Sequence, residues 1–113
     1  MKVILVNGSP HKEGCTYTAL KEVEKELINS GVETEMIWLG VKPVSGCLGC
    51  AQCIKKGPDG EKPTLRCVIN DGVNEFLDKA EKADGFVFGS PVHYASISGA
   101  LSSFMDRAFY GKG

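Results

Sequence analysis

The sequence predicts an α/β protein built on a doubly wound parallel sheet, and three observations support this class. Short runs rich in Val, Ile and Phe alternate with longer segments of helical period. The first run, Val3 to Val6, is apolar throughout, as expected of a parallel strand buried on both faces. A polar loop longer than the roughly 2–6 residues of an ordinary connection joins it to the first helical segment. Such alternation favours parallel strands joined by right-handed crossovers.

The predicted elements follow one another without a repeat or a low-complexity stretch. Strands are expected at residues 1–7, 34–39 and 85–89. Helices are expected at residues 16–30, 71–83 and 98–109, with an irregular segment rich in Gly, Pro and Cys at 40–70. Gly31 is well placed to end the first helix, and Ser98 to cap the third. The apolar stripes of the three helices comprise Leu20, Val23 and Leu27; Val73, Phe76, Leu77 and Ala80; and Leu101, Phe104, Met105 and Ala108.

Length and composition allow one globular domain, residues 1–113, and exclude several classes of function. The net charge of −1 gives no electrostatic reason to expect nucleic acid or an anionic membrane as a partner. No apolar run approaches the ~20 residues of a membrane span, and no signal-peptide pattern precedes the first strand. A cytoplasmic location is therefore expected, where cysteines serve as ligands or redox thiols more often than in disulfides.

The loop from Gly8 to Thr16, with the sequence GSPHKEGCT, has the features of a phosphate site. It offers backbone N–H groups, hydroxyls and the partial positive charge of a helix N-terminus. It lacks the Gly-Lys-Ser/Thr of a Walker loop and the Gly-x-Gly-x-x-Gly of a dinucleotide fold. A tightly held mononucleotide is the expected ligand. The alternative is an ordinary strand-to-helix turn with Thr16 as its N-cap.

A second loop, Ser90 to Ser96 with the sequence SPVHYAS, follows the third strand. In the strand order 2-1-3, the first and third strands are neighbours, so both loops face one crevice at the carboxyl edge of the sheet. Ligands of doubly wound sheets bind there. His93 and Tyr94 are also compatible with a surface loop that binds nothing. The third strand would remain an edge in this arrangement, so further strands are expected from additional chain or from a partner subunit.

The cysteines Cys47, Cys50 and Cys53 follow the spacing Cys-x2-Cys-x2-Cys, which suits three thiolates around one iron–sulfur cubane. Cys67 is the candidate fourth ligand, and residues 54–66 must loop out and return. Two alternatives stay open: a zinc site, and a cluster-free loop that shapes the rim of the crevice or forms disulfides on oxidation. Cys15, at a helix N-terminus, is a reactive thiol or a spacer in the phosphate loop.

Taken together, these motifs resemble the flavodoxin-like NAD(P)H-dependent FMN reductases, and among them most closely the iron–sulfur flavoproteins. The resemblance rests on Gly8-Ser9-Pro10 with Gly14 and Thr16, and on the run GCLGCAQC from Gly46. It continues through Ala83-Asp84-Gly85 and Gly89-Ser90-Pro91-Val92-His93-Tyr94 to the helical segment from Ser98 to Arg107. It covers nearly the whole chain and corresponds to the first three βα units of a five-unit fold.

The resemblance implies FMN as cofactor, with its phosphate in the first loop and its ring system against the second. The implied phosphate-side positions are Ser9, His11, Cys15 and Thr16. The implied ring-side positions are Pro91, Val92, His93, Tyr94 and Ser96. A [4Fe-4S] cluster on Cys47, Cys50, Cys53 and Cys67 is the implied metal group. No side chain need act as acid or base, because the flavin carries the chemistry.

Three functions are compatible with these expectations. The first is an oxidoreductase that passes electrons from NAD(P)H through FMN to a quinone, a flavin or another small-molecule or protein acceptor. The second is an iron–sulfur flavoprotein that carries electrons from a ferredoxin-like donor. The third is an incomplete or partner-dependent fragment without activity of its own. A homodimer or higher oligomer is expected, because a second subunit would cover the exposed third strand.

Overall fold

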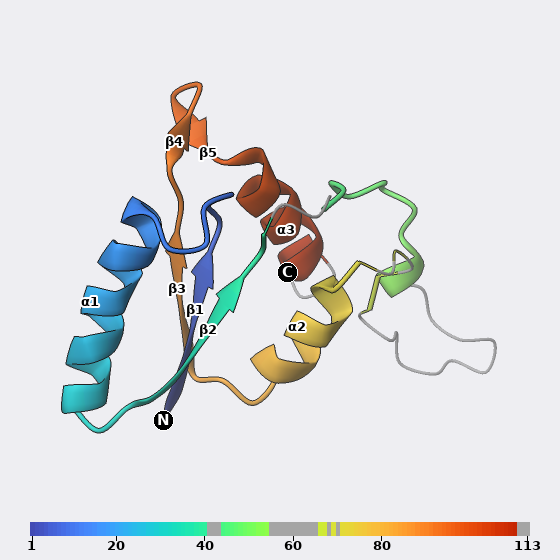
Figure 1. Cartoon of the computed structure of the whole chain (residues 1–113). Helices are drawn as coiled ribbons and strands as arrows, with labels where there is room; N and C mark the ends of the chain where they lie inside the picture. Colours follow the sequence, from blue (N-terminus) through green and yellow to red (C-terminus); the bar gives the residue numbers. More distant parts are fainter. Residues whose placement is uncertain (41–43, 55–65, 68, 70, 111–113) are drawn as a thin grey trace.

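A parallel sheet in the order β2-β1-β3 forms the centre of the protein, as expected. The computed structural model describes residues 1–40, 44–54, 66–67, 69 and 71–110. The strands are β1 (Lys2–Asn7), β2 (Glu33–Trp38) and β3 (Gly85–Gly89). Leu5 of β1 pairs with Met36 on one side and with Val87 on the other. All three strands therefore end at one edge of the sheet (Figure 1), which brings their following loops together.

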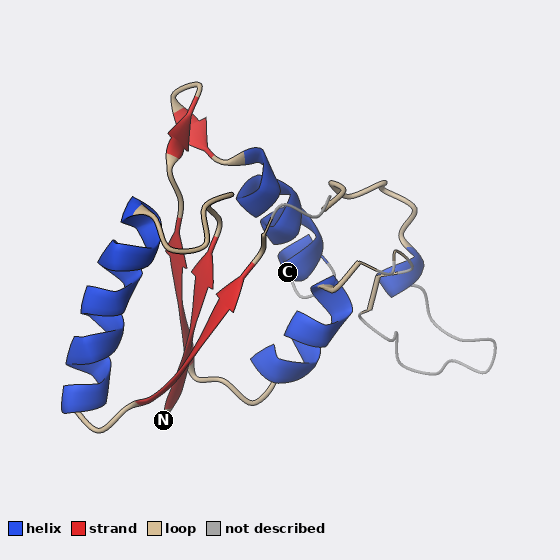
Figure 2. Cartoon of the chain, viewed as in Figure 1, coloured by secondary structure: helices blue, strands red, loops and turns tan. Residues whose placement is uncertain are grey.

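Helices cover both faces of this sheet. The helices are α1 (Cys15–Asn29), α2 (Val73–Ala80) and α3 (Gly99–Tyr110). Figure 2 shows α1 on one side of the strands and α2 with α3 on the other. Ile4 and Val6 join the core cluster of α2 and α3, in which the rings of Phe76 and Phe104 meet edge to face with centroids 4.7 Å apart. Each fully buried aliphatic side chain of β1 contributes about 1.5–3 kcal/mol.

The first helix begins one residue earlier than predicted. Gly14 occupies its N-cap position in an extended conformation, and Thr16 lies within the first turn. Thr16 is therefore not the N-cap, so the simple-turn interpretation of this loop is wrong in that respect. The helix ends at Asn29, and Gly31 follows with φ of 82°, the left-handed stop that the sequence predicts.

The second helix is shorter than the expected 71–83. Gly72, with φ of 100°, delays its start to Val73 because a left-handed residue cannot continue a helix. After Ala80 the chain tightens into turns, in which Lys82 and Ala83 donate to carbonyls three residues back. The expected irregular segment 40–70 lies partly outside the described residues, and its described part contains the 3₁₀ helix η1 (Gln52–Ile54).

The loop expected at residues 90–96 is instead a short β-hairpin. Strands β4 (Val92–His93) and β5 (Ser96–Ile97) pair antiparallel. Their two-residue turn places Tyr94 and Ala95 at φ of 46° and 61°. Two left-handed residues define the turn that best matches the twist of paired strands, although glycine or asparagine normally occupies it. The hairpin projects from the carboxyl end of β3 (Figure 1).

Strand β3 lies at an edge of the three-stranded sheet, as expected. Beside it, Val23 of α1 is 40% exposed, although the helical period predicts that it faces inward. The reason is that Val23 lines an open groove with Val87 and Phe88 at the edge strand, where no further described strand covers it. Among the described helices, none combines the length and the hydropathy that a membrane crossing requires.

Candidate functional site

The phosphate loop after β1 is held in shape by its own side chains. Asn7, only 1% exposed, accepts a hydrogen bond from the Ser9 N–H at 3.0 Å and donates from Nδ2 to the Lys12 carbonyl at 3.2 Å. The Ser9 hydroxyl in turn accepts the His11 N–H at 3.1 Å. Ser9 is buried and braces the loop from within, whereas His11 is exposed on its rim.

Trp38, at the end of β2, braces the same loop from outside. Its indole N–H donates to the Ser9 carbonyl at 2.9 Å. The ammonium of Lys12 lies 5.7 Å from the centre of its ring, within cation–π range. These contacts thus fix the part of the loop from Ser9 to Lys12 before any ligand binds, which lowers the entropic cost of binding.

The start of α1 has the features expected of an anion site. No side chain caps the helix, and its first turn contains no acidic residue. Thr16 is half-buried in that turn, and Cys15 is exposed beside it. The free N–H groups and the helix dipole favour an anionic group at this position.

The loops after β1 and β3 are tied together by short contacts. The Gly8 N–H donates to the Gly89 carbonyl at 2.8 Å, and the Ser98 hydroxyl donates to the Gly8 carbonyl at 2.7 Å. A Cβ on Gly8 would lie 2.7 Å from the Cβ of Leu101, so only glycine allows α3 to approach this closely. The two predicted loops therefore share one edge of the sheet, as the strand order requires.

The predicted ring-side residues all lie on or next to the hairpin. Pro91 is half-buried at its base, whereas Val92, His93, Tyr94 and Ser96 are exposed. The base is fixed because the Ser90 hydroxyl accepts the Ser98 N–H at 2.8 Å. The hairpin thus presents a mixed polar and aromatic surface at the carboxyl ends of the strands, on a fixed base.

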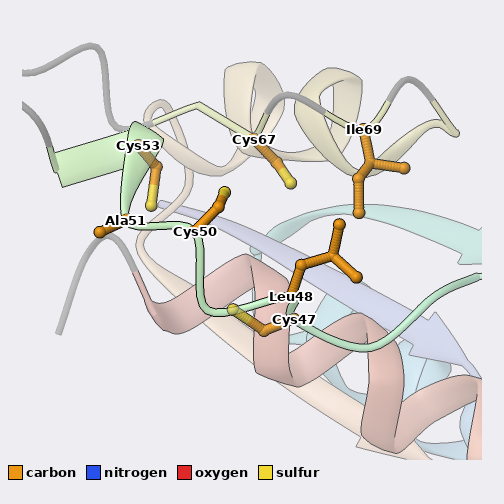
Figure 3. A pocket seen from close by; sticks show the side chains of 7 residues that line it. All are labelled: Cys47, Leu48, Cys50, Ala51, Cys53, Cys67 and Ile69. Atoms are coloured by element: carbon orange, nitrogen blue, oxygen red, sulfur yellow. The ribbon is translucent and has the colours of Figure 1, made fainter.

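The four cysteines of the predicted metal site line one pocket. Figure 3 shows Cys47, Cys50, Cys53 and Cys67 around this pocket, together with Leu48, Ala51 and Ile69. Cys47 and Cys50 come from the segment that leads into η1, Cys53 lies within η1, and Cys67 comes from the chain that returns toward α2. Within the part of the chain that is described, no three His, Cys, Asp or Glu side chains are close enough to hold a single metal ion.

A buried ion pair lies behind the cysteine pocket. Arg107 of α3 binds both carboxylate oxygens of Asp71 through Nη1 and Nη2, and Nε donates to the Cys67 sulfur at 3.4 Å. The hydrogen bonds from Arg107 to the carboxylate lower the pKa of Asp71 below its ordinary value, and the Coulomb attraction of Arg107 adds to this effect. Burial acts in the opposite direction. The Asp71 carboxylate correspondingly raises the pKa of Arg107.

Sequence reasoning did not identify Asn7, Trp38 or the Asp71–Arg107 pair as parts of the site. Asn7 and Trp38 are the last residues of adjacent strands, β1 and β2. A polar or amphipathic residue at the carboxyl end of a parallel strand is the signal that points to them. For Arg107, a charge on the inward side of an otherwise apolar helix stripe provides a comparable signal.

The fold and the paired loops define a flavodoxin-like α/β protein. The family model described as NADPH-dependent FMN reductase matches residues 1–113, and the chain belongs to this family. The resemblance inferred from the motifs is therefore confirmed.

Curated relatives specify the branch of the family. An iron-sulfur flavoprotein of Methanocaldococcus jannaschii is 39% identical over 108 residues, which are 96% of this chain and 52% of the relative. An iron-sulfur flavoprotein of Archaeoglobus fulgidus is 34% identical over 107 residues, or 95% of this chain and 45% of the relative. The chain thus spans about half the length of these relatives.

Solved structures support the same fold. The crystal structure of the Streptococcus mutans protein Smu.1420 superposes with a TM-score of 0.67 at 20% identity, over 96% of this chain and 53% of that one. An FMN-dependent NADH-azoreductase of Bacillus anthracis, in complex with FMN, gives a TM-score of 0.60 at 22% identity, over 95% and 55% of the two chains.

Proposed function

We propose that this chain is the FMN-binding part of an oxidoreductase that transfers electrons from NAD(P)H through FMN to a small-molecule or protein acceptor. The observation that carries the proposal is the convergence of two braced loops at the carboxyl edge of β1 and β3, one joined to an uncapped helix N-terminus. A nucleotide phosphate and a ring system are the two ligand parts that such a pair of loops accommodates.

The chemistry of the described residues at the two loops supports FMN as the ligand. The first turn of α1 offers N–H groups and the Thr16 hydroxyl to the phosphate, with His11 at the rim. On the ring side, Pro91 and Val92 offer apolar surface, and His93, Tyr94 and Ser96 offer polar and aromatic groups. Bound flavin would supply the hydride and electron chemistry, while the protein orients it.

A comparison of FMN with riboflavin tests the phosphate site, because the two ligands differ only in the phosphate. We expect the chain to bind FMN at least about tenfold more tightly, since hydrogen bonds to a charged group contribute about 1.5–3 kcal/mol each. Thr16→Val should reduce this preference. Thr18→Val is the matched control, because its hydroxyl donates to the Gly14 carbonyl within the helix. Equal affinity of the wild-type chain for both ligands would contradict a phosphate site.

Hydride transfer is tested separately by anaerobic addition of NADH or NADPH to the FMN-loaded protein. Bleaching of the flavin absorption near its visible maximum is the expected result. If the bound FMN stays oxidised with both nucleotides but is reduced by dithionite, NAD(P)H is not the donor. The proposal of FMN binding would be unaffected by that result.

A second candidate function, electron transfer through an iron–sulfur cluster, is favoured by the cysteine pocket. Four thiols around one pocket are a soft donor set that suits iron–sulfur clusters. Each thiolate of a cubane binds a different iron, so these ligands stand farther apart than the ligands of one zinc ion. Among the described residues no group of three or more donors fits one metal ion, which gives zinc no support, and the Cys-x2-Cys-x2-Cys series favours the cluster.

Iron and acid-labile sulfide, measured per chain after anaerobic purification, test this second function. About four of each are expected. Cys50→Ser should lower both, whereas Cys15→Ser, at an exposed cysteine outside the run, should leave iron content unchanged. A wild-type chain without iron or sulfide would rule the cluster out.

The described cysteines are all unpaired thiols, which fits the proposed cytoplasmic location.

We also propose that a second copy of the chain covers β3. Apolar grooves flank this edge strand on both sides, one with α1 and one with α2 and α3. An exposed strand edge between two apolar grooves favours association.

A further inference from the structure

Arg107 is an unusual residue for its position. Its side chain is 4% exposed, and no other charged side chain is buried among the described residues. It lies on the inward side of α3, between the buried Phe104 and Ala108. Burying a cation is costly even when it is paired, and an apolar side chain of similar size often serves stability better. A role beyond packing would explain its presence.

All five N–H donors of the Arg107 guanidinium have acceptors. Two bind the Asp71 carboxylate, Nη1 to Oδ2 and Nη2 to Oδ1, the latter at 2.6 Å. Nη1 also donates to the Ser45 carbonyl and Nη2 to the Ile69 carbonyl, each at 3.2 Å. Nε donates to the Cys67 sulfur at 3.4 Å. A lysine has three donors on one atom and cannot reproduce this fork.

These acceptors lie on both sides of the cysteine run. Ser45 precedes Cys47, whereas Cys67, Ile69 and Asp71 belong to the chain that returns from the run. The Ser45 carbonyl and the Asp71 carboxylate both accept from Nη1 of Arg107, so the guanidinium joins the two flanks directly. One side chain of α3 thus sets where Cys67 stands relative to the start of the run.

We propose that Arg107 is a positioning residue for the cysteine pocket: it joins the two flanks of the run and donates a hydrogen bond to the Cys67 sulfur, which stabilises a cluster held there. This inference rests on the proposed cluster site. Hydrogen bonds from the protein to ligand sulfurs hold the ligands and raise the reduction potential, because they stabilise the more negative, reduced cluster.

The paired substitution Asp71→Asn/Arg107→Gln tests this inference without changing net charge. It removes the fork and leaves no buried charge unpaired. We expect the cluster to be held about 10- to 100-fold less tightly, measured by iron release to a chelator. We also expect its reduction midpoint to move to a more negative potential, which a purely structural role would not produce.

The matched control is Glu35→Gln/Lys79→Gln, which removes an exposed ion pair between β2 and α2 and also preserves net charge. It should change neither the iron release nor the potential. Arg107→Lys, which keeps the charge, provides a second test if the double variant does not fold. It should release iron faster than the wild type, because the donor to Cys67 is lost.

The outcomes separate the two proposals. A wild-type chain without iron would overturn the cluster site, and this inference with it. A wild-type chain with a cluster, together with variants that match it in both iron release and midpoint potential, would overturn the role of Arg107 alone. Faster release with a more negative potential would support it.

Discussion

The indole of Trp38 links the end of β2 to the Ser9 carbonyl in the middle of the phosphate loop. Trp38 is the chain's single tryptophan, and Lys12 lies over its ring. Together with Asn7 it fixes the loop before ligand binding. The sequence predicts the loop and its helix, but these two braces depend on contacts between residues of different elements, which local patterns do not reveal.

Trp38→Phe removes the indole N–H and keeps an aromatic ring. We expect FMN to bind roughly 2- to 12-fold more weakly, because one hydrogen bond contributes about 0.5–1.5 kcal/mol. Equilibrium titration of the flavin fluorescence measures this change. Thr34→Val is the control: it removes a hydrogen bond to Glu24 elsewhere on β2 and should leave FMN affinity unchanged. Unaltered affinity in Trp38→Phe would show that the indole does not brace the loop.

The Asp71–Arg107 pair gives a pH dependence of known sign. Because the folded-state pKa of Asp71 is lowered from about 3.8, its contribution is present above that value and is lost as pH falls through the folded-state pKa. Asp71→Asn should cost roughly 3–5 kcal/mol near neutral pH, since it leaves Arg107 unpaired. Urea unfolding at several pH values should show this difference shrinking below about pH 4. A difference that stays constant down to pH 2 would contradict the assignment.

At the scale of elements, helix α3 joins the core to the site. Its stripe of Leu101, Phe104 and Ala108 is buried, as the helical period predicts. Ser98, just before its first residue, links it to the loop after β1, since the Ser98 hydroxyl accepts the Leu101 N–H at 3.2 Å and donates to the Gly8 carbonyl. The predicted cap at Ser98 is therefore confirmed, and the bond to Gly8 adds a contact with the phosphate loop.

Ser98→Ala removes both of these hydrogen bonds at a buried position. The expected cost is about 1–2 kcal/mol in the free energy of unfolding, the range of a lost helix cap. Ser102→Ala, one turn further along α3 and exposed, should change stability by less than about 0.5 kcal/mol. Chemical denaturation measures both. Equal effects of the two substitutions would rule out a special role for Ser98.

Strands and helices were predictable where hydrophobic periodicity is strong, and less so at their ends. The start of α2 depends on the left-handed Gly72, and the periodicity alone extends the helix past it. The hairpin was missed because its turn residues, Tyr94 and Ala95, lack the usual glycine or asparagine signal. The start of α2 and the hairpin therefore depend on tertiary contacts that local sequence patterns do not reveal.

At the level of the whole molecule, β3 is the strand whose outer side has no partner among the described strands. It is an edge strand with an apolar sequence, flanked by two grooves. The relatives are about twice as long as this chain. The sequence predicted this edge correctly, because the order 2-1-3 leaves Phe86-Val87-Phe88 without an outer neighbour among the described strands.

Val87→Lys should prevent the proposed association through β3. Val87 lines the groove beside α1, where a charged side chain would be buried in a dimer. Sedimentation velocity should show the wild-type chain as a dimer and the variant as a monomer. Ile28→Lys, at an exposed position near the far end of α1, is the control and should remain dimeric. A monodisperse wild-type monomer would contradict the proposal.

The proposed function depends on FMN binding by the two loops at the carboxyl ends of β1 and β3. An anaerobic absorption spectrum of the purified chain, recorded before and after FMN is added and the excess removed, tests it most directly. We expect retained flavin bands at about one FMN per chain. A folded protein without flavin bands after incubation with FMN would contradict this expectation.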